Sequence, residues 1–259
     1  MSDLRGVLFF GAHPDDETVM AGGTLAMLHA QGAPVYVVCA TDGRGGESGD
    51  VPEADTPEKL AVVRMDELRC AAVALGVDGV TWLGYEDPVM GPDEELFGFA
   101  AHEETLVAQV TAHILEKEAS VVISHGSNGE YGHPAHVQMH RAVARAVREQ
   151  VPNVLFYSVA ARVPEIEDRL WNASDAAHLA LDITPWIEAK HAAMLCHRTQ
   201  HALFKRRRKL ATVREAIRTV ESFRRQWPPL ADDAAPDDAF ADALRSAGAW
   251  QPQHPRMDP

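Results

Sequence analysis

The chain has 259 residues, enough for one large α/β domain with a full hydrophobic core. Acidic residues outnumber Lys and Arg by 38 to 24, a formal net charge of −14, and such a field repels the phosphate backbones of nucleic acids. No stretch approaches the roughly 18 apolar residues of a membrane span, and the N-terminus lacks a signal-peptide pattern. The three cysteines, Cys39, Cys70 and Cys196, are widely spaced, so we expect no disulfide framework and a reducing, cytoplasmic location.

Apolar runs alternate with helical patterns through the first part of the chain. We expect strands at 6–12, 34–40, 80–83, 120–124 and 154–157, and helices at 17–31, 57–75, 103–117 and about 135–149. Strands that alternate with helices of this length are typical of right-handed βαβ units. The predicted fold class is therefore α/β, with a Rossmann-like, mainly parallel sheet flanked by helices.

The C-terminal region has a different pattern. Helix formers predominate from about residue 185, so we expect helices at 186–197 and 203–227. The basic run Lys205–Lys209 lies inside the second of these segments, and we interpret it as a solvated helix face rather than a patch that binds polyanions.

We place a boundary after Trp227. Residues 1–227 are expected to form a single α/β metallohydrolase domain, and residues 228–259, which are rich in Pro, Asp and Ala, an irregular tail or packing arm. Phe240, Leu244 and Trp250 in this tail would dock it on a neighbouring chain and so favour a homo-oligomer.

Two polar segments follow predicted strands. Residues 13–17 (HPDDE) come after the strand at 6–12, and residues 129–136 (GEYGHPAH) follow the strand at 120–124. Ligands of an open α/β sheet bind outside the carboxyl ends of its strands, so both segments should face one crevice.

Each polar segment offers a pair of metal ligands three residues apart. The first pair is His13 and Asp16, and the second is His133 and His136. Two imidazoles and one carboxylate, with a fourth position for water, form a typical catalytic zinc shell. Asp15 would then be the general base, and an unligated His133 would stabilise an oxyanion or protonate a leaving amine.

These motifs resemble the LmbE-like, or PIG-L, family of zinc-dependent N-deacetylases over most of residues 5–225. The hallmarks are Ala-His-Pro-Asp-Asp-Glu at 12–17 and the His-Pro-x-His segment at 133–136. Lesser features occur in the same order as in the family: a glycine-rich loop at 41–49, an Arg-x-x-Glu helix at 64–67, a loop at 83–90 and a Lys…His-x-x-Gln helix at 190–200.

The resemblance implies roles for the residues of both hallmarks. His13, Asp16 and His136 would ligate the metal, zinc in the family, although Fe2+ or another divalent ion also suits such ligands. Asp15 would take a proton from the water on the metal. His133 would assist as a cation or an acid, and Tyr131 would be a mobile contact near the oxyanion.

The resemblance also implies contacts to the substrate. Arg64 and Asp87 match positions that contact a sugar, while His197 and Gln200 match the late helix that lines the pocket. Arg44 lies in the glycine-rich loop, which we interpret as a loop on the substrate side, and its side chain would reach the ligand.

One position departs from the commonest pattern of the family. The third residue of the second hallmark is often Asp and is Ala135 here. An Asp at this point could hold the neighbouring histidine and raise its pKa, so His133 is expected to be less cationic unless another carboxylate substitutes. The ligand set itself is unaffected.

The expected function is the removal of an N-acetyl group from an amino sugar or an N-acetylglucosaminyl conjugate. A glucosaminyl precursor of a low-molecular-weight thiol is the first substrate to consider. An amidase for another N-acyl conjugate is the nearest alternative. Two histidines and a carboxylate also bind Fe(II) in oxygenases, but Asp15 favours a hydrolase. A non-catalytic nucleotide-binding module would need a glycine fingerprint after the first strand, and here the glycine-rich loop follows the second.

Overall fold

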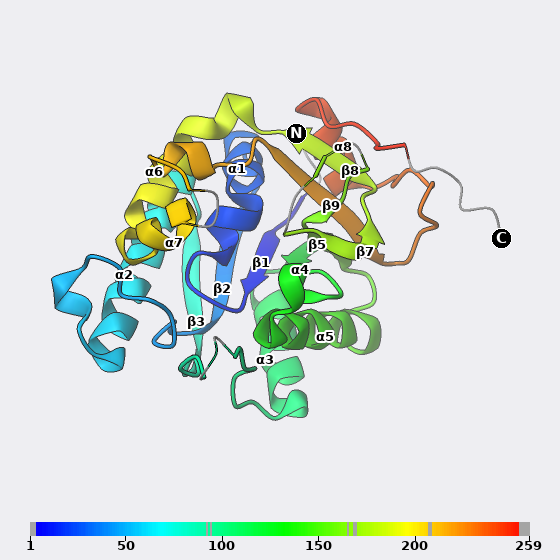
Figure 1. Cartoon of the computed structure of the whole chain (residues 1–259). Coiled ribbons are helices and arrows are strands. Elements are labelled where there is room, and N and C mark those ends of the chain that lie inside the picture. Colours follow the sequence, from blue (N-terminus) through cyan, green and yellow to red (C-terminus); the bar gives the residue numbers. More distant parts are fainter. Residues whose placement is uncertain are drawn as a thin grey trace.

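The computed structural model describes residues 4–91, 93, 95–164, 166–167, 170–206 and 209–253. Five parallel strands form most of a seven-stranded sheet: β1 (Val7–Gly11), β2 (Val35–Thr41), β3 (Gly79–Tyr85), β4 (Val121–Ser124) and β5 (Leu155–Val159). Two antiparallel strands, β8 (Leu179–Asp182) and β9 (Val220–Trp227), complete it in the order β3-β2-β1-β4-β5-β9-β8 (Figure 1). The predicted α/β fold and mainly parallel sheet are confirmed.

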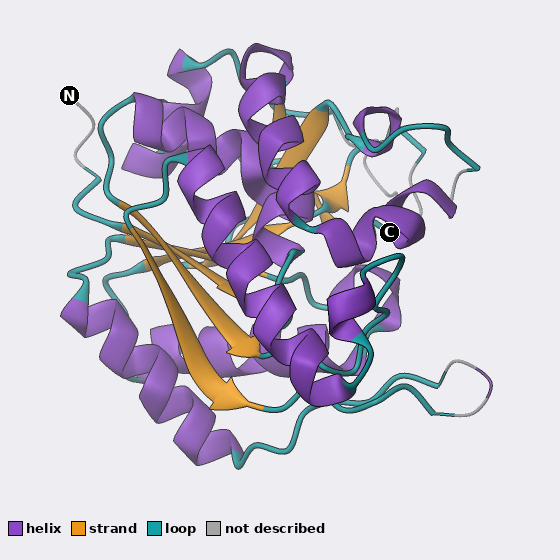
Figure 2. Cartoon of the chain, turned by 90° about the vertical axis from the view of Figure 1, so that its left-hand side faces the viewer, coloured by secondary structure: helices purple, strands orange, loops and turns teal. Residues whose placement is uncertain are grey.

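Helices cover both faces of this sheet, as the view along it shows (Figure 2). One face carries α1 (Asp16–Ala30), α2 (Pro57–Leu75), α6 (Ile187–Cys196) and α8 (Ala239–Ser246), and the other carries α3 (Glu103–Glu116) and α5 (Pro134–Glu149). Side chains alternate along β1, so that Phe9 packs into the first core and Leu8 and Phe10 into the second. All three side chains are fully buried, as expected for a central parallel strand.

Shorter elements connect this framework. They are a two-stranded sheet of β6 (Ala161–Arg162) and β7 (Asn172–Ala176), the short helices α4 (Gly129–Gly132) and α7 (His201–Arg206), and the 3-10 turns η1 (Pro52–Ala54), η3 (Thr184–Trp186), η4 (Arg198–Gln200) and η5 (Arg214–Ala216).

The predicted C-terminal helix at 203–227 is wrong. α7 ends at Arg206, and residues 220–227 form strand β9 instead. Buried Phe223 packs in the core beside β5, so tertiary packing overrides the helical propensity of this Arg-rich segment. Of the basic run 205–209, Arg207 and Arg208 lie outside the described residues.

Part of the region after Trp227 is helical and packs on the chain itself. Helix α8 begins after Asp238, whose side chain accepts a hydrogen bond from the backbone N–H of Ala241. Phe240 and Leu244 are fully buried in the core beside the sheet. Their apolar side chains are thus covered within one chain rather than by a neighbour.

Cys70 on α2 and Cys196 at the end of α6 form a disulfide bond, with their Cα atoms 5.7 Å apart. The expectation of no disulfide is therefore wrong. The two cysteines are 126 residues apart, and only the packing of α2 against α6 brings them together. Cys39 is buried and free, in agreement with its predicted place in a strand.

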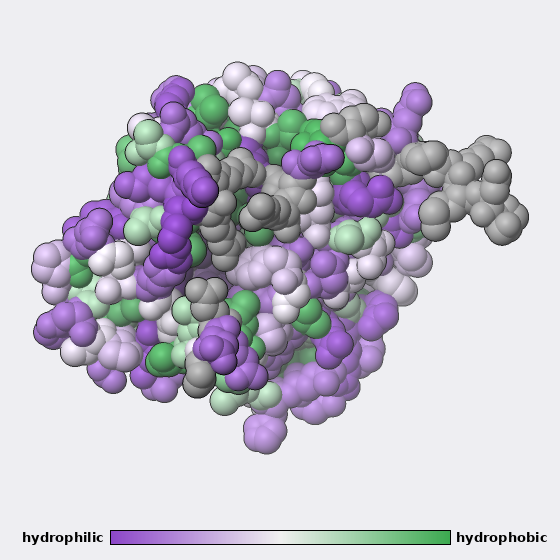
Figure 3. All heavy atoms as spheres, in the orientation of Figure 1, coloured by the Kyte–Doolittle hydropathy of each residue, from purple (hydrophilic) through white to green (hydrophobic). Residues whose placement is uncertain are grey.

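Within the described residues, no helix is both long and apolar enough to cross a membrane. On the face shown in Figure 3, hydrophobic residues form small groups among hydrophilic ones. This mixed surface agrees with the chain's charged fraction of 24%.

Candidate metal centre and active site

The site lies at the switch point of the sheet, where the connections of neighbouring parallel strands leave in opposite directions. β1 pairs in parallel with both β2 and β4, and the chain continues from β1 to β2 on one side but reaches β4 only after β3 and α3. Such a switch point leaves a crevice at the carboxyl ends of the strands. Residues of both predicted segments, 13–17 and 129–136, line one cavity of about 540 Å³ there.

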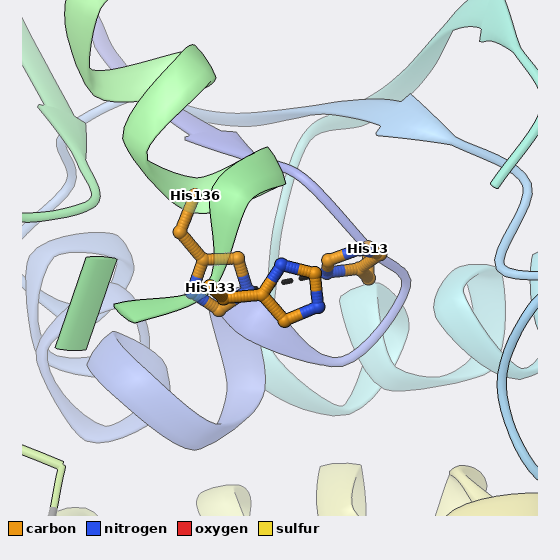
Figure 4. A group of neighbouring side chains, drawn as sticks. All are labelled: His13, His133 and His136. Carbon is orange, nitrogen blue, oxygen red and sulfur yellow. Dashed lines mark hydrogen bonds between the residues drawn. The ribbon is translucent and has the colours of Figure 1, made fainter. Parts of the chain in front are cut away.

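Three ligand atoms from these segments converge in the crevice. His13 Nδ1 lies 3.2 Å from His136 Nε2, and Asp16 Oδ1 lies 3.4 Å from the same His136 atom. Figure 4 shows His13 on the loop after β1 pointing toward His136 on α5. Four ligands at about 2.0 to 2.1 Å from a tetrahedral zinc ion lie about 3.3 Å apart, and both of these distances are close to that value. His13 Nδ1 also lies 3.6 Å from the second oxygen of Asp16, Oδ2. All three residues are buried.

Among the described residues, two groups of three side chains bring their ligand atoms within 4.8 Å of one another. One group is His13, His133 and His136, and the other is Asp16, His125 and His136. His136 belongs to both groups, so a buried His/Asp site suited to a divalent metal ion is present. His125, directly after β4, is a member that the sequence analysis missed, although a histidine at the end of a strand is a recognisable signal.

Carboxylates behind the histidines fix their rings. His136 Nδ1 donates to Glu130 Oε2 at 2.6 Å, which leaves Nε2 for a metal ion. On the other side, His13 Nε2 lies 3.3 Å from Asp87 Oδ1, which leaves Nδ1. Such carboxylate partners are usual for metal-bound histidines. The sequence analysis also missed Glu130, whose neighbours in the second hallmark it did identify.

The carboxylates of the site make its electrostatic potential strongly negative. Although burial opposes it, Asp87 and Asp16 raise the pKa of His13 to about 10. Burial likewise opposes the charge of Asp16, but His136 and His125 hold the pKa of that carboxyl well below its usual range. A field that favours a proton on His13 also favours a bound metal cation.

Asp15 occupies a strained backbone position beside the ligands. Its φ of +128° and ψ of −20° lie in a region that side chains other than glycine rarely adopt. Burial raises the pKa of its carboxyl to about 6, and the Arg64 guanidinium, 3.5 Å from Asp15 Oδ1, opposes this. A carboxylate with such a pKa is suited to accept a proton near neutral pH.

His133 is held as a hydrogen-bond acceptor at the start of α5. Its Nδ1 accepts from the backbone N–H of Ala135 at 3.2 Å, so a neutral ring carries its proton on Nε2. Burial and the nearby His13 and His136 lower the pKa of His133 to about 3. Tyr131, 40% exposed, stands edge-on to His133 with their ring centroids 5.7 Å apart.

The structure separates the residues predicted to contact substrate. Arg64, Asp87 and Gln200 line the cavity. Arg44 does not, because its guanidinium pairs with Asp42 and Glu86. His197 is fully buried outside the cavity lining, with Nε2 3.3 Å from Glu17 Oε1.

Apolar side chains also line the cavity. They include Met20, Met90, Phe97, Met194, Leu203 and Phe204, and the lining further includes Arg206 and Arg218. A small amino-sugar ring and a further group attached to it can thus occupy the same cavity.

The sequence matches a known family and curated relatives. A family model described as GlcNAc-PI de-N-acetylase (PIG-L) matches residues 8–147. A 1D-myo-inositol 2-acetamido-2-deoxy-alpha-D-glucopyranoside deacetylase from Mycobacterium sp. (strain KMS) is 35% identical over 233 residues, which cover 77% of this chain and 76% of that protein.

Solved structures share the fold. N,N'-diacetylchitobiose deacetylase from Pyrococcus horikoshii is similar with a TM-score of 0.62 at 21% identity, covering 86% of this chain and 84% of that one. GalB, the 4-carboxy-2-hydroxymuconate hydratase from Pseudomonas putida KT2440, has a TM-score of 0.61 at 22% identity, covering 89% and 99%. Because a deacetylase and a hydratase share it, the fold alone does not define the reaction.

Proposed function

The chain belongs to the PIG-L family of de-N-acetylases, and from this membership we propose that it removes the N-acetyl group from a glucosaminyl-inositol conjugate, releasing acetate and a free amine. The family and the enzyme class, a hydrolase of amide C–N bonds, are those predicted from the sequence, and both are confirmed. The observation that carries the proposal is the convergence of His13, Asp16 and His136 beside the half-buried carboxylate of Asp15. The relative from Mycobacterium supports the substrate class.

We propose zinc as the ion and His13, Asp16 and His136 as its ligands. Asp16 Oδ2 already accepts the backbone N–H groups of Ala12 and His13, at 2.9 and 2.7 Å, so Oδ1 is the oxygen that remains for the ion. A set of two nitrogens and one oxygen with an open fourth position is typical of catalytic zinc sites. When bound, such an ion polarises the amide carbonyl and makes a water molecule more acidic.

Asp15 then moves the protons. Its carboxylate accepts a proton as the water oxygen attacks the amide carbon, and it can return that proton to the nitrogen as the C–N bond breaks. The balance is one water consumed, with acetate and a free amine formed. Arg64, close to Asp15, favours the charged form of this base.

His133 stabilises the charge that develops on the carbonyl oxygen. Because its Nδ1 accepts from Ala135, its Nε2–H is free to donate to that oxygen. This assignment needs a neutral ring and so needs no Asp at position 135. Tyr131, partly exposed at the cavity, would contact the same oxygen.

Asp87, Arg64 and Gln200 would contact the sugar from the cavity wall. Arg64 has less freedom to do so, since its NH1 and NH2 donate to the carbonyls of Gly43 and Pro14. The cytoplasmic location and the homo-oligomer stay predictions, and the disulfide removes the cysteine argument for a reducing compartment.

Metal content and acetate release, measured on the glucosaminyl-inositol conjugate, test the proposal. The wild type is compared with Asp15→Ala and with Asp66→Ala, an exposed carboxylate on α2 that serves as the control. We expect zinc in all three proteins and acetate release at least about 100-fold slower in Asp15→Ala alone.

Other outcomes separate the alternatives. If the wild type binds zinc but releases no acetate from any N-acetylglucosaminide, the substrate would instead be another N-acyl conjugate. A purified protein that binds no divalent metal would overturn the proposal.

A further inference from the structure

Two fully buried residues outside the cavity connect to the proposed base. We propose that Glu17 and His197 form a positioning pair that holds Asp15 in its strained conformation, an inference that rests on the role of Asp15 proposed above. His197 would then act on catalysis through Asp15. It would not bind the sugar, although the family resemblance suggested a contact with substrate.

The backbone of Asp15 is strained and needs support from its neighbours. A residue other than glycine at φ +128° costs on the order of 1 to 3 kcal/mol, so neighbouring contacts must maintain it. One contact is the hydrogen bond from the Asp15 N–H to Glu17 Oε2 at 3.2 Å, and another is that from the Val19 N–H to the Asp15 carbonyl at 2.9 Å. The side chain of Asp15 makes no capping bond to α1 and so faces the cavity.

Glu17 is buried and has partners on both carboxylate oxygens. Its carboxylate is 1% exposed, and burying it is costly unless each oxygen has partners. Oε2 accepts from Asp15, and Oε1 accepts from Thr18 Oγ1 at 2.5 Å and lies 3.3 Å from His197 Nε2. The two oxygens of Glu17 thus contact the backbone of the strained residue and the ring of His197 respectively.

The segment that carries His197 is anchored to α2 on both sides of this residue. Cys196 is joined to α2 by the disulfide, and Thr199 donates from its N–H and Oγ1 to Glu67 on α2, at 3.0 and 2.6 Å. His197 therefore sits between two anchored residues and can transmit that rigidity to Glu17. Neither Glu17 nor His197 lines the cavity, so neither side chain is placed to contact a substrate.

The kinetic test compares His197→Ala, Glu17→Ala and Glu17→Gln, with His201→Gln on the neighbouring helix as the control. We expect kcat to fall about 10- to 100-fold in both alanine variants, because a misplaced base loses reactive geometry. KM should stay within about two-fold, since no sugar contact is lost. Glu17→Gln keeps an oxygen that can accept the Asp15 N–H and should recover most of kcat.

A double variant gives a readout that a merely structural role would not produce. In the Asp15→Ala background, adding His197→Ala should cause no further loss of kcat, because the pair acts only through Asp15. A rise in KM with an intact kcat in His197→Ala would instead make His197 a sugar contact and overturn the proposal. Unchanged kinetics in both alanine variants, or a further loss in the double variant, would overturn it equally.

Crystal structures of metal-free His197→Gln and Glu17→Ala make the test independent of turnover and of the most disruptive variant. We expect φ of residue 15 to return to negative values in Glu17→Ala and the Asp15 carboxylate to shift in both. An unchanged residue 15 in both crystals overturns the inference. If the wild type releases no acetate, the proposed function fails by itself, and these crystal structures alone decide the positioning pair.

Discussion

At the scale of single residues, Glu130 links His125 and His136, the two histidines of one candidate metal group that follow β4 in the chain. Its Oε2 accepts from His136 at 2.6 Å and lies 3.0 Å from His125 Nδ1, and its Oε1 accepts from the Asn172 amide at 3.0 Å. Although burial opposes it, His125 and His136 hold the pKa of Glu130 well below its usual range. A φ of +60° shows that the backbone is bent to place this carboxylate.

Glu130→Gln should weaken zinc binding about 10- to 100-fold, because the amide carries no negative charge and its NH2 group would face the Gly126 N–H and the Asn172 amide, which now donate to Oε1. Competition with a chelator of known affinity measures the change. Glu116→Gln, an exposed glutamate at the end of α3, provides the control. Equal zinc affinity in wild type and Glu130→Gln would show that this carboxylate does not support the ligand.

The sequence identified the residues that lie within contiguous motifs and missed those whose role depends on three-dimensional packing. His13, Asp16 and His136 stand in two short segments at strand ends, where chemistry and location coincide. Glu130 lies in the second polar segment, but its role depends on contacts with His125 and with Asn172, the latter 42 residues away. His197 was assigned to the cavity by resemblance, whereas only the structure shows that it faces Glu17.

At the scale of secondary structure, a buried ion pair ties three elements together. Lys190 on α6 donates to Glu221 Oε1 on β9 at 2.7 Å and to the carbonyl of Val19 on α1 at 3.0 Å. Glu221 in turn accepts from the backbone N–H groups of Gly23 and Thr24, in the interior of α1. Lys190 and Glu221 together thus connect α6 and β9 to α1.

Lys190→Met should lower the free energy of unfolding by about 3 to 5 kcal/mol, because Glu221 would remain buried without its cation. Urea denaturation measures this loss. The double variant Lys190→Met/Glu221→Gln should lose less than the single one, since it removes the uncompensated charge. A double variant as unstable as the single one would argue that packing, and not charge, dominates here.

The Cys70–Cys196 disulfide should stabilise the packing of α2 on α6. It closes a loop of 126 residues, for which chain entropy alone gives about 4 to 5 kcal/mol. Reduction with dithiothreitol should therefore lower the urea midpoint of the wild type. Cys70→Ser should start from the lower midpoint and show no response to the reductant, and an equal response in both proteins would exclude this bond as the cause.

His178 gives the antiparallel edge of the sheet a pH dependence. Its Nε2 donates to the carbonyl of Ala231 at 3.0 Å while Nδ1 accepts from the Arg225 N–H at 3.1 Å, so the folded state needs the neutral ring. Burial and Arg224 lower its pKa to about 4.

The unfolded chain therefore binds this proton more readily than the folded one, and stability is lost as the pH falls from about 6.5 toward 4. His178→Gln can form both hydrogen bonds without titrating. Urea midpoints measured between pH 7 and 5 should drop less in the variant than in the wild type, and parallel curves would rule His178 out.

Local signals explain which elements could be predicted. For helix α2, Thr56 caps the first turn, Pro57 starts the helix and Gly76 ends it with φ +75°, so the predicted bounds 57–75 are confirmed. β9 carries no such punctuation, and its arginines favour a helix in isolation. Its strand conformation depends on pairing with β5, more than 60 residues earlier in the chain, and short-range patterns do not contain that information.

At the scale of the whole molecule, a metal ion would join the β1–α1 segment, which carries His13 and Asp16, to α5, which carries His136. Zinc at about 100 times its Kd should add about 2.7 kcal/mol to the folded state, if the unfolded chain does not bind it. Thermal unfolding with a chelator and after zinc is restored should therefore differ by several degrees in Tm. His136→Ala should lose this response, and a zinc response that persists there would place the ion elsewhere.

The pairing of β1 with β4 has a consequence for how the protein is made. His13 and His136 are 123 residues apart, so during synthesis the first ligand leaves the ribosome long before its partner exists. Capture of a metal ion by both of these proposed ligands would wait until β4 has docked against β1 and α5 has begun to form. An ion held by both segments would then mark chains whose central strands have assembled in the right order, and it would bind misassembled chains poorly.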